Sequence, residues 1–189
     1  MLYQKGNFYH IYNRGCNKLP IFFHKGNYHF LIQKFIDSFE KHEIEISAYC
    51  LMPNHYHLLI KQNSNIPVSK WIKTVFNGYT QAINKQENRK GTLFEGRAKS
   101  KIILDENQLI HSICYIHYNP VQAGLVEFAE NWEFSDYSDW TGIRKNKLFN
   151  DNLLKQYFVS FEGYKEFFNE YIPTLKSAKQ YNELLFDAA

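Results

Sequence analysis

The chain has 189 residues, of which 44% are hydrophobic and 17% aromatic, so it is long enough and apolar enough to bury a core. This composition excludes an intrinsically disordered chain, and the formal net charge of +3 is too small to identify a partner. No apolar run is long enough to cross a bilayer, the first residues lack a signal-peptide pattern, and the cysteines are scattered. We therefore expect a cytoplasmic protein without a membrane partner, in which Cys16, Cys50 and Cys114 are reduced thiols.

Hydrophobic periodicity predicts alternating strands and helices along most of the chain. The predicted elements are, in chain order, a strand at 8–15, a helix at 26–43, a hairpin of strands at 44–52 and 55–62, and a helix at 66–87. A segment at 91–104 with glycines, positive charges and a short β-like end follows, and then a helix at 105–120. The hairpin turns at Pro53–Asn54, and the last helix begins at the capping residue Asp105 and ends at Pro120. This order predicts an α+β fold, a ferredoxin-like antiparallel sheet with helices packed on one face.

The last quarter of the chain is expected to form an extension. After a first domain at 1–142, residues 143–189 predict a linker and one or two helices, with a break at Gly163. Apolar residues gather at the start of this extension, so it can pack against the domain, contact DNA or meet a partner. The sequence leaves these roles open.

Two histidines interrupt the apolar strand at 55–62, which reads "HYHLLIKQ". Because side chains alternate along a strand, His55 and His57 point to one face and the apolar residues between and after them point to the other. Two imidazoles about 7 Å apart along one strand face can bind one metal ion. They can equally be ordinary polar residues on the outer face of a half-buried strand, and the spacing alone does not decide.

The predicted helix at 105–120 carries a polar stripe. His111, Tyr115 and Asn119 are spaced i, i+4 and i+8, away from the apolar stripe that includes Leu109. Such a stripe usually faces solvent. If the helix instead crosses the histidine face of the sheet, Tyr115 and Asn119 reach the histidine pair. Two imidazoles and an amide oxygen would then hold a divalent ion, with Mg²⁺ or Mn²⁺ suited to a phosphate substrate and Tyr115 placed as a nucleophile.

Four motifs occur in order along the chain. They are "YHIYNRG" at 9–15, "YCLMPNHYHLLI" at 49–60, "GTLFEGRAKSKII" at 91–103 and "YIHYNPVQAGLV" at 115–126. Together, over residues 3–142, they resemble the REP-associated tyrosine transposases. These are relatives of the small insertion-sequence transposases among the HUH (His-hydrophobe-His) nucleases.

The resemblance implies a ferredoxin-like fold and one catalytic tyrosine on a helix. It also implies a divalent metal at the histidine pair, and cleavage of single-stranded DNA near a hairpin with the enzyme left attached to the 5′ phosphate. By motif position, His55 and His57 are metal ligands, Tyr115 is the nucleophile and Asn119 is the third ligand. The implied partner is single-stranded DNA with a hairpin, bound by a monomer or a homodimer.

Positive charges gather between residues 89 and 101, where only Glu95 opposes five lysines and arginines. Such a run can bind phosphates, although it is often only a solvated surface. The candidate contacts to the DNA backbone are Arg14, Arg97, Lys99 and Lys101. Phe94, Tyr118 and Trp132 are candidates for stacking on unpaired bases, and we expect Phe94 and Trp132 to be structural instead.

The chain departs from the family pattern at two positions. Gln122 stands where the family usually has arginine, and "FSDYSDW" at 134–140 stands where a Ser-Ser-Tyr pattern is expected, so no role is carried over to either. Two alternative functions stay open. One is a non-catalytic DNA-hairpin-binding protein derived from such a transposase, and the other is a metal phosphodiesterase that uses water, with Tyr115 structural.

Overall fold

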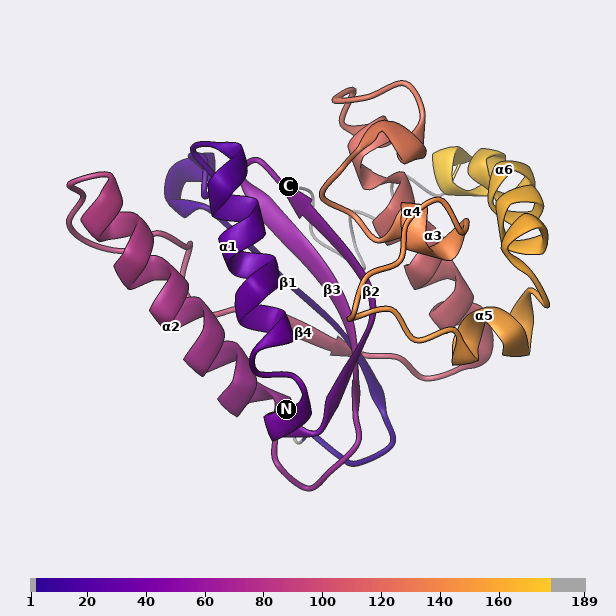
Figure 1. Ribbon diagram of the computed structural model, residues 1–189, viewed down its shortest axis with the longest axis horizontal. Helices are drawn as coiled ribbons and strands as arrows, with labels where there is room; N and C mark the ends of the chain where they lie inside the picture. The colour runs from indigo at the N-terminus through magenta and orange to yellow at the C-terminus, as the bar shows by residue number, and fades with distance from the viewer. Residues whose placement is uncertain (1–2, 178–189) are drawn as a thin grey trace.

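A computed structural model describes residues 3–177, and its elements follow the predicted order (Figure 1). The elements are β1 (Phe8–Arg14), η1 (Cys16–Lys18), α1 (Lys25–Ile36), η2 (Glu40–His42), β2 (Ile44–Met52), β3 (His55–Gln62), α2 (Val68–Gln86), β4 (Lys99–Ile102), α3 (Glu106–Gln122), η3 (Ala129–Asn131), α4 (Tyr137–Trp140), α5 (Asn152–Tyr157) and α6 (Phe161–Ser177). The predicted bounds of both hairpin strands are confirmed. No helix within the described residues has the length and apolar character needed to cross a bilayer.

The four strands form one antiparallel sheet in the order β2-β3-β1-β4. Strand β1 lies between β3 and the short strand β4, so segments far apart in the sequence become neighbours. In this register Tyr12 lies opposite both His57 on β3 and Lys99 on β4, and His10 lies opposite Lys101. The sheet confirms the predicted ferredoxin-like α+β fold.

The two faces of the sheet carry different helices (Figure 1). On one face, α1 and α2 cover an apolar core that includes Tyr9, Ile11 and Leu58. On the other face, α3 packs against β2 and β3, and α6 packs against α3. The expectation of helices on one face is therefore wrong for the C-terminal helices. The second face carries apolar side chains such as Cys50 and Leu59, which also need cover from water.

Helix α3 is buried along most of its length. The Asp105 side chain caps it by accepting a hydrogen bond from the backbone N–H of Gln108 at 2.7 Å. The predicted end at Pro120 is wrong by two residues, since the helix continues to Gln122. The proline lies in the last turn, where its missing N–H costs only one hydrogen bond, and the N–H of Ala123 closes that turn on the Asn119 carbonyl at 2.9 Å.

Helix α1 is shorter than its hydrophobic pattern predicts, because it ends at Ile36 and not at residue 43. After its end, the Ser38 hydroxyl donates to the Lys34 carbonyl at 2.6 Å. Glu43 then adopts a left-handed conformation, with φ of 48°, and leads the chain into β2. A right-handed helix cannot continue through such a residue, so the apolar spacing extends further than the helix does.

Helices α5 and α6 belong to the predicted extension, of which residues 178–189 lie outside the described residues. Gly163 does not break the helix as expected. It lies in the first turn of α6, where a Cβ would come within 2.2 Å of the Phe158 carbonyl oxygen. Helix α6 packs on α3, and its Tyr164 hydroxyl hydrogen-bonds to Nδ1 of His117 at 2.5 Å. Of the roles left open for the extension, this contact favours packing against the first domain. The domain boundary at residue 142 stays a prediction.

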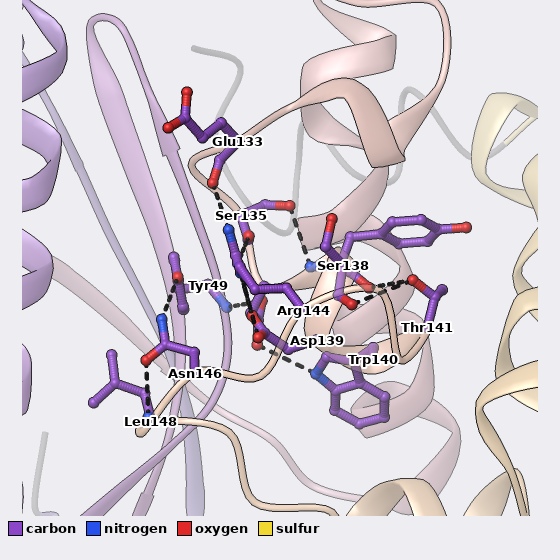
Figure 2. Close-up of polar contacts among 12 residues, drawn as sticks. Tyr49, Glu133, Ser135, Ser138, Asp139, Trp140, Thr141, Arg144, Asn146 and Leu148 are labelled. Atoms are coloured by element: carbon purple, nitrogen blue, oxygen red, sulfur yellow. Dashed lines mark hydrogen bonds and ion pairs between the residues drawn. The ribbon is translucent and has the colours of Figure 1, made fainter.

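Arg144, which follows α4, binds residues that lie within and before that helix (Figure 2). Its guanidinium binds the buried Asp139 carboxylate at 2.6 Å. It also donates to the backbone carbonyls of Glu133 at 2.8 Å and Ser135 at 2.5 Å. The segment "FSDYSDW" at 134–140 is thus ordered by these contacts and lies beside β2, where Ser135 pairs with Cys50.

Candidate active site

The two histidines of β3 point to the same face of the sheet, as strand alternation predicts. Their ring centroids are 5.2 Å apart, their planes are nearly perpendicular at 86°, and both side chains are buried. The Nε2 atoms of His55 and His57 have no hydrogen-bond partner within residues 3–177. A buried polar atom without a partner is costly, so these two nitrogens are suited to bind a ligand such as a metal ion.

The Nδ1 atoms of the same two rings are both engaged. Nδ1 of His55 lies 2.7 Å from the side-chain oxygen of Asn54, and Nδ1 of His57 lies 3.0 Å from Nε2 of His10 on β1. Sequence reasoning assigned neither Asn54 nor His10 to the site. His10 lies in the "YHIYNRG" motif, but strand alternation does not tell which strand will become its neighbour.

Burial keeps the three imidazoles neutral at pH 7. Burial and the nearby Lys101 lower the pKa of His10 to about 3. Burial lowers the pKa of His55 to about 4, although the Asn119 side chain opposes this shift. Burial, together with the neighbouring His10 and His55, holds the pKa of His57 well below its ordinary value. Neutral imidazole is the form that binds metal ions, so the site is ready for a cation at neutral pH.

Helix α3 places Tyr115 against the histidine pair. The Tyr115 ring stands edge-on to His57 at 86°, with centroids 5.5 Å apart, and lies 6.3 Å from the His10 ring. The structure therefore brings together the predicted nucleophile and the predicted ligands. His111, one turn earlier in the same polar stripe, instead hydrogen-bonds to the Tyr171 hydroxyl of α6 at 3.1 Å.

Asn119 lies one turn after Tyr115 and belongs to the same site. Its Nδ2 is 3.4 Å from the Tyr115 carbonyl. Its side chain opposes the lowering of the His55 pKa, although Nε2 of His55 has no hydrogen-bond partner within residues 3–177. Within residues 3–177, no three His, Cys, Asp or Glu side chains are grouped to hold a metal ion. The Asn119 amide oxygen is the further ligand that the motif resemblance predicts for the histidine pair. Two imidazole nitrogens and one amide oxygen fit a divalent ion with positions open for substrate oxygens.

Two of the predicted DNA contacts, Lys99 and Lys101, lie on the histidine face. Each is paired across β1 and β4 with a residue of that face, Lys99 with Tyr12 and Lys101 with His10. Residues directly opposite each other in a sheet share a face. The Lys99 ammonium lies 5.9 Å from the centre of the Tyr12 ring. Both lysines thus place positive charge beside the histidine pair.

The two predicted arginine contacts are separated by the structure. Arg14 lies opposite His55 in the sheet and forms an ion pair with Glu95, so it belongs to the edge of the site. Arg97 lies away from this site. It lines a cavity of about 580 Å³ on the other side of the sheet, together with two lysines of α2. The cluster of charges at 89–101 therefore does not form one surface.

The aromatic candidates for base stacking are mainly structural. Phe94 is buried and contacts Tyr56 with ring centroids 5.8 Å apart. The indole N–H of Trp132 donates to the Leu51 carbonyl at 3.0 Å. Tyr118, on α3, is also buried. These contacts agree with the expectation that Phe94 and Trp132 are structural: Phe94 is buried, and Trp132 is partly buried and packs against the core.

Known proteins resemble this chain in sequence. The sequence model of the family described as "Transposase IS200 like" matches residues 4–119, which is more than half of the chain. A relative from Haemophilus influenzae, assigned to the REP-associated tyrosine transposases, is 28% identical over 133 residues. This match covers 59% of the chain and 75% of the relative.

A solved structure resembles this chain in fold. It is a REP-associated tyrosine transposase bound to a REP hairpin, and it superposes with a TM-score of 0.64 at 20% sequence identity. The match covers 75% of this chain and 83% of that chain. The family model confirms the transposase family that the four sequence motifs resemble, and the solved structure confirms the fold.

Proposed function

The chain belongs to the IS200-like transposase family, and we propose that it is a metal-dependent enzyme that cleaves and rejoins single-stranded DNA near a hairpin. One observation carries this proposal. Tyr115 on α3 stands 5.5 Å, between ring centroids, from His57, which shares its sheet face with His55. A hydroxyl nucleophile beside a pair of imidazoles that can bind a metal ion suits phosphodiester cleavage through a covalent intermediate.

Tyr115 is the proposed nucleophile. Its phenol oxygen bonds to a backbone phosphorus while the bond from that phosphorus to the 3′ oxygen breaks. The proton lost by the tyrosine balances the proton gained by the 3′ hydroxyl. The resulting 5′-phosphotyrosine retains the energy of the phosphodiester, so a 3′ hydroxyl can reverse the step and join a strand. Because α3 is buried between the sheet and α6, the attacking ring is held in a fixed direction.

His55, His57 and Asn119 would hold the divalent ion, which we propose to be Mg²⁺ or Mn²⁺. A bound ion of this kind polarises the phosphate oxygens and stabilises charge on the leaving oxygen. The chain contributes two neutral, buried imidazoles whose Nε2 atoms are directed away from their Nδ1 partners. Three protein ligands leave positions for the substrate.

Lys99, Lys101 and Arg14 are the proposed contacts to the DNA backbone on this face. Their charges lie beside the histidine pair and supply sequence-independent affinity that decreases with salt. The solved relative is bound to a REP hairpin, and we propose that this chain also binds a single strand that carries a hairpin. The proposal applies to a monomer and to a homodimer.

Covalent trapping tests the proposal. The protein is incubated with Mn²⁺ and a labelled single strand carrying a hairpin, and the products are resolved on a denaturing gel. We expect an adduct with the wild-type protein and none with Tyr115→Phe, which loses only a hydroxyl and should still bind the DNA. Tyr118→Phe is the matched control, since Tyr118 is buried on the same helix and should retain the adduct.

The same gel separates the alternatives. Cleavage without an adduct would identify a phosphodiesterase that uses water, and hairpin binding with neither product would identify a non-catalytic binding protein. Either result contradicts the proposal. An adduct that survives Tyr115→Phe but disappears in Tyr118→Phe would move the nucleophile by three residues and retain the covalent mechanism.

A further inference from the structure

His10 is buried at the centre of the sheet, on the same face as the proposed metal ligands and beside His57. It lies in the middle of β1, is inaccessible to solvent and contacts His57 of the neighbouring strand β3. The two rings are within 11° of parallel, and Nε2 of His10 lies 3.0 Å from Nδ1 of His57. This distance and orientation correspond to a hydrogen bond between two imidazoles.

From this contact we infer that His10 is a positioning residue, which accepts a hydrogen bond from Nδ1–H of His57 and so keeps Nε2 of His57 available for a metal ion. The inference rests on the proposed metal site at His55 and His57. His10 acts through Nδ1 of His57, and no contact with the substrate is assigned to it.

The chemistry of neutral imidazole supports this assignment. A neutral ring carries one proton, on Nδ1 or on Nε2, and only the unprotonated nitrogen can bind a cation. If His10 donated to His57, the His57 proton would lie on Nε2 and block that atom. If His57 donates to His10, Nε2 of His57 keeps its lone pair. Metal ligation by His57 is therefore compatible with only one direction of this hydrogen bond.

The second histidine of the pair shows the same arrangement. Nδ1 of His55 lies 2.7 Å from the side-chain oxygen of Asn54, which can only accept a hydrogen bond. The Asn54 amide nitrogen is in turn directed to the Lys18 carbonyl at 3.3 Å, which fixes the orientation of the amide. His55 is thus set with its proton on Nδ1 and its lone pair on Nε2.

A purely structural role for His10 would satisfy only Nδ1 of His57. Within residues 3–177, Nε2 of that ring would stay buried without a hydrogen-bond partner, at a cost in free energy. Two neighbouring rings, each with an engaged Nδ1 and a buried Nε2 without a partner, are instead typical of metal ligands oriented by residues behind them.

Two substitutions distinguish the roles. His10→Gln can present an amide oxygen near the position of the imidazole Nε2, so it retains the acceptor. His10→Met fills a similar volume without one. Tyr12→Phe is the matched control, because Tyr12 lies on the same strand and its ring lies 5.9 Å from that of His57.

The first readout is Mn²⁺ affinity, measured by calorimetry without DNA. We expect His10→Met to weaken Mn²⁺ binding by about 10- to 100-fold, the usual effect of losing a residue that orients a metal ligand. His10→Gln should recover most of that loss, and Tyr12→Phe should bind as the wild type does. Equal affinity of wild type and His10→Met, or equal losses in His10→Met and His10→Gln, would overturn the inference.

The second readout needs no substitution, so it holds even if a variant fails to fold. Long-range ¹H–¹⁵N spectra of the imidazoles in the metal-free wild-type protein identify which nitrogen of His57 carries the proton before any ion binds. A proton on Nδ1 is the expected result, and a proton on Nε2 would overturn the inference. A wild-type protein that binds neither Mn²⁺ nor Mg²⁺ would remove the proposed metal site as well, whereas metal binding that is insensitive to His10 removes this inference alone.

Discussion

The edge of the Tyr115 ring faces the imidazole of His57, with ring centroids 5.5 Å apart and planes at 86°. The two residues are on α3 and β3, and they meet because α3 crosses the face of the sheet that α1 and α2 leave uncovered. This contact joins the family's tyrosine motif to its histidine motif in one buried site.

The histidine pair should be needed for cleavage and dispensable for binding. We expect His55→Ala and His57→Ala each to abolish DNA cleavage with Mn²⁺ and to change the affinity for a hairpin strand less than about threefold. The reason is that binding depends mainly on contacts to phosphates and bases. Cleavage gels and fluorescence anisotropy measure the two effects.

His111→Gln is the control for this prediction. His111 lies on the same helix as Tyr115, but it contacts Tyr171 of α6 and not the site. The His111→Gln variant should cleave DNA at the wild-type rate. A cleavage defect in His111→Gln as severe as that in His57→Ala would mean that the assay reports general damage to the second face of the sheet.

Lys99 and Lys101 should contribute more to DNA affinity than Arg97. The two lysines lie on the histidine face, whereas Arg97 lines a cavity on the other face. Each lysine-to-alanine change should weaken binding for all sequences tested and reduce the slope of log affinity against log salt by about 1. Arg97→Ala should leave the slope unchanged. Titrations at four salt concentrations measure this, and the reverse ranking would show that the DNA runs along the α2 face.

The metal-free protein should lose stability as the pH falls from about 6.5, the value for histidine in an unfolded chain, toward about 4. Burial lowers the pKa of His10 to about 3 and that of His55 to about 4, so the unfolded chain binds more protons in this range. The free energy of unfolding is then highest above pH 6.5 and decreases below it. Urea titrations in EDTA at several pH values measure this effect.

His10→Gln removes one of these groups and serves as the control for the pH dependence. Its stability should fall less steeply between about pH 6.5 and 4, because one buried group that resists protonation is gone. If the two proteins show parallel curves, protonation of His10 does not contribute to acid unfolding.

Arg144→Met should destabilise the fold by about 3–5 kcal/mol, because it leaves the Asp139 carboxylate buried without its partner. The Asp139 side chain has no exposed surface, and Arg144 also donates to two backbone carbonyls (Figure 2). Lys155→Met is the matched control. It breaks an exposed i,i+4 ion pair with Asp151 and should cost less than about 1 kcal/mol. Urea unfolding measures the loss of unfolding free energy in each variant. Similar losses in the two variants would contradict the prediction.

Only one of the three thiols should react in the folded protein. Cys50 and Cys114 are fully buried, and burial raises the pKa of both thiols, whereas Cys16 is partly exposed. The thiolate is the reactive form, so a thiol reagent should modify Cys16 alone until denaturant is added. Mass spectrometry counts the modified residues, and Cys16→Ser should abolish labelling of the native protein.

The sequence by itself determined the direction of side chains within each element. Strand alternation placed His55 and His57 on one face, and the Pro53–Asn54 turn located the hairpin within its observed bounds. Asp105 marked the start of α3 through a cap that depends only on neighbouring residues. These features are local, and local periodicity and capping follow from the backbone geometry of a few consecutive residues.

Only the tertiary structure decided which elements meet. It brought His10 to His57 across 47 positions of sequence, placed Tyr115 against the same ring, and separated Arg97 from the lysines that follow it. It also covered the second face of the sheet with α3 and α6. A repeating pattern fixes where a side chain points relative to its own strand or helix. It carries no information about the neighbour on that side, which is selected by the burial of all apolar faces at once.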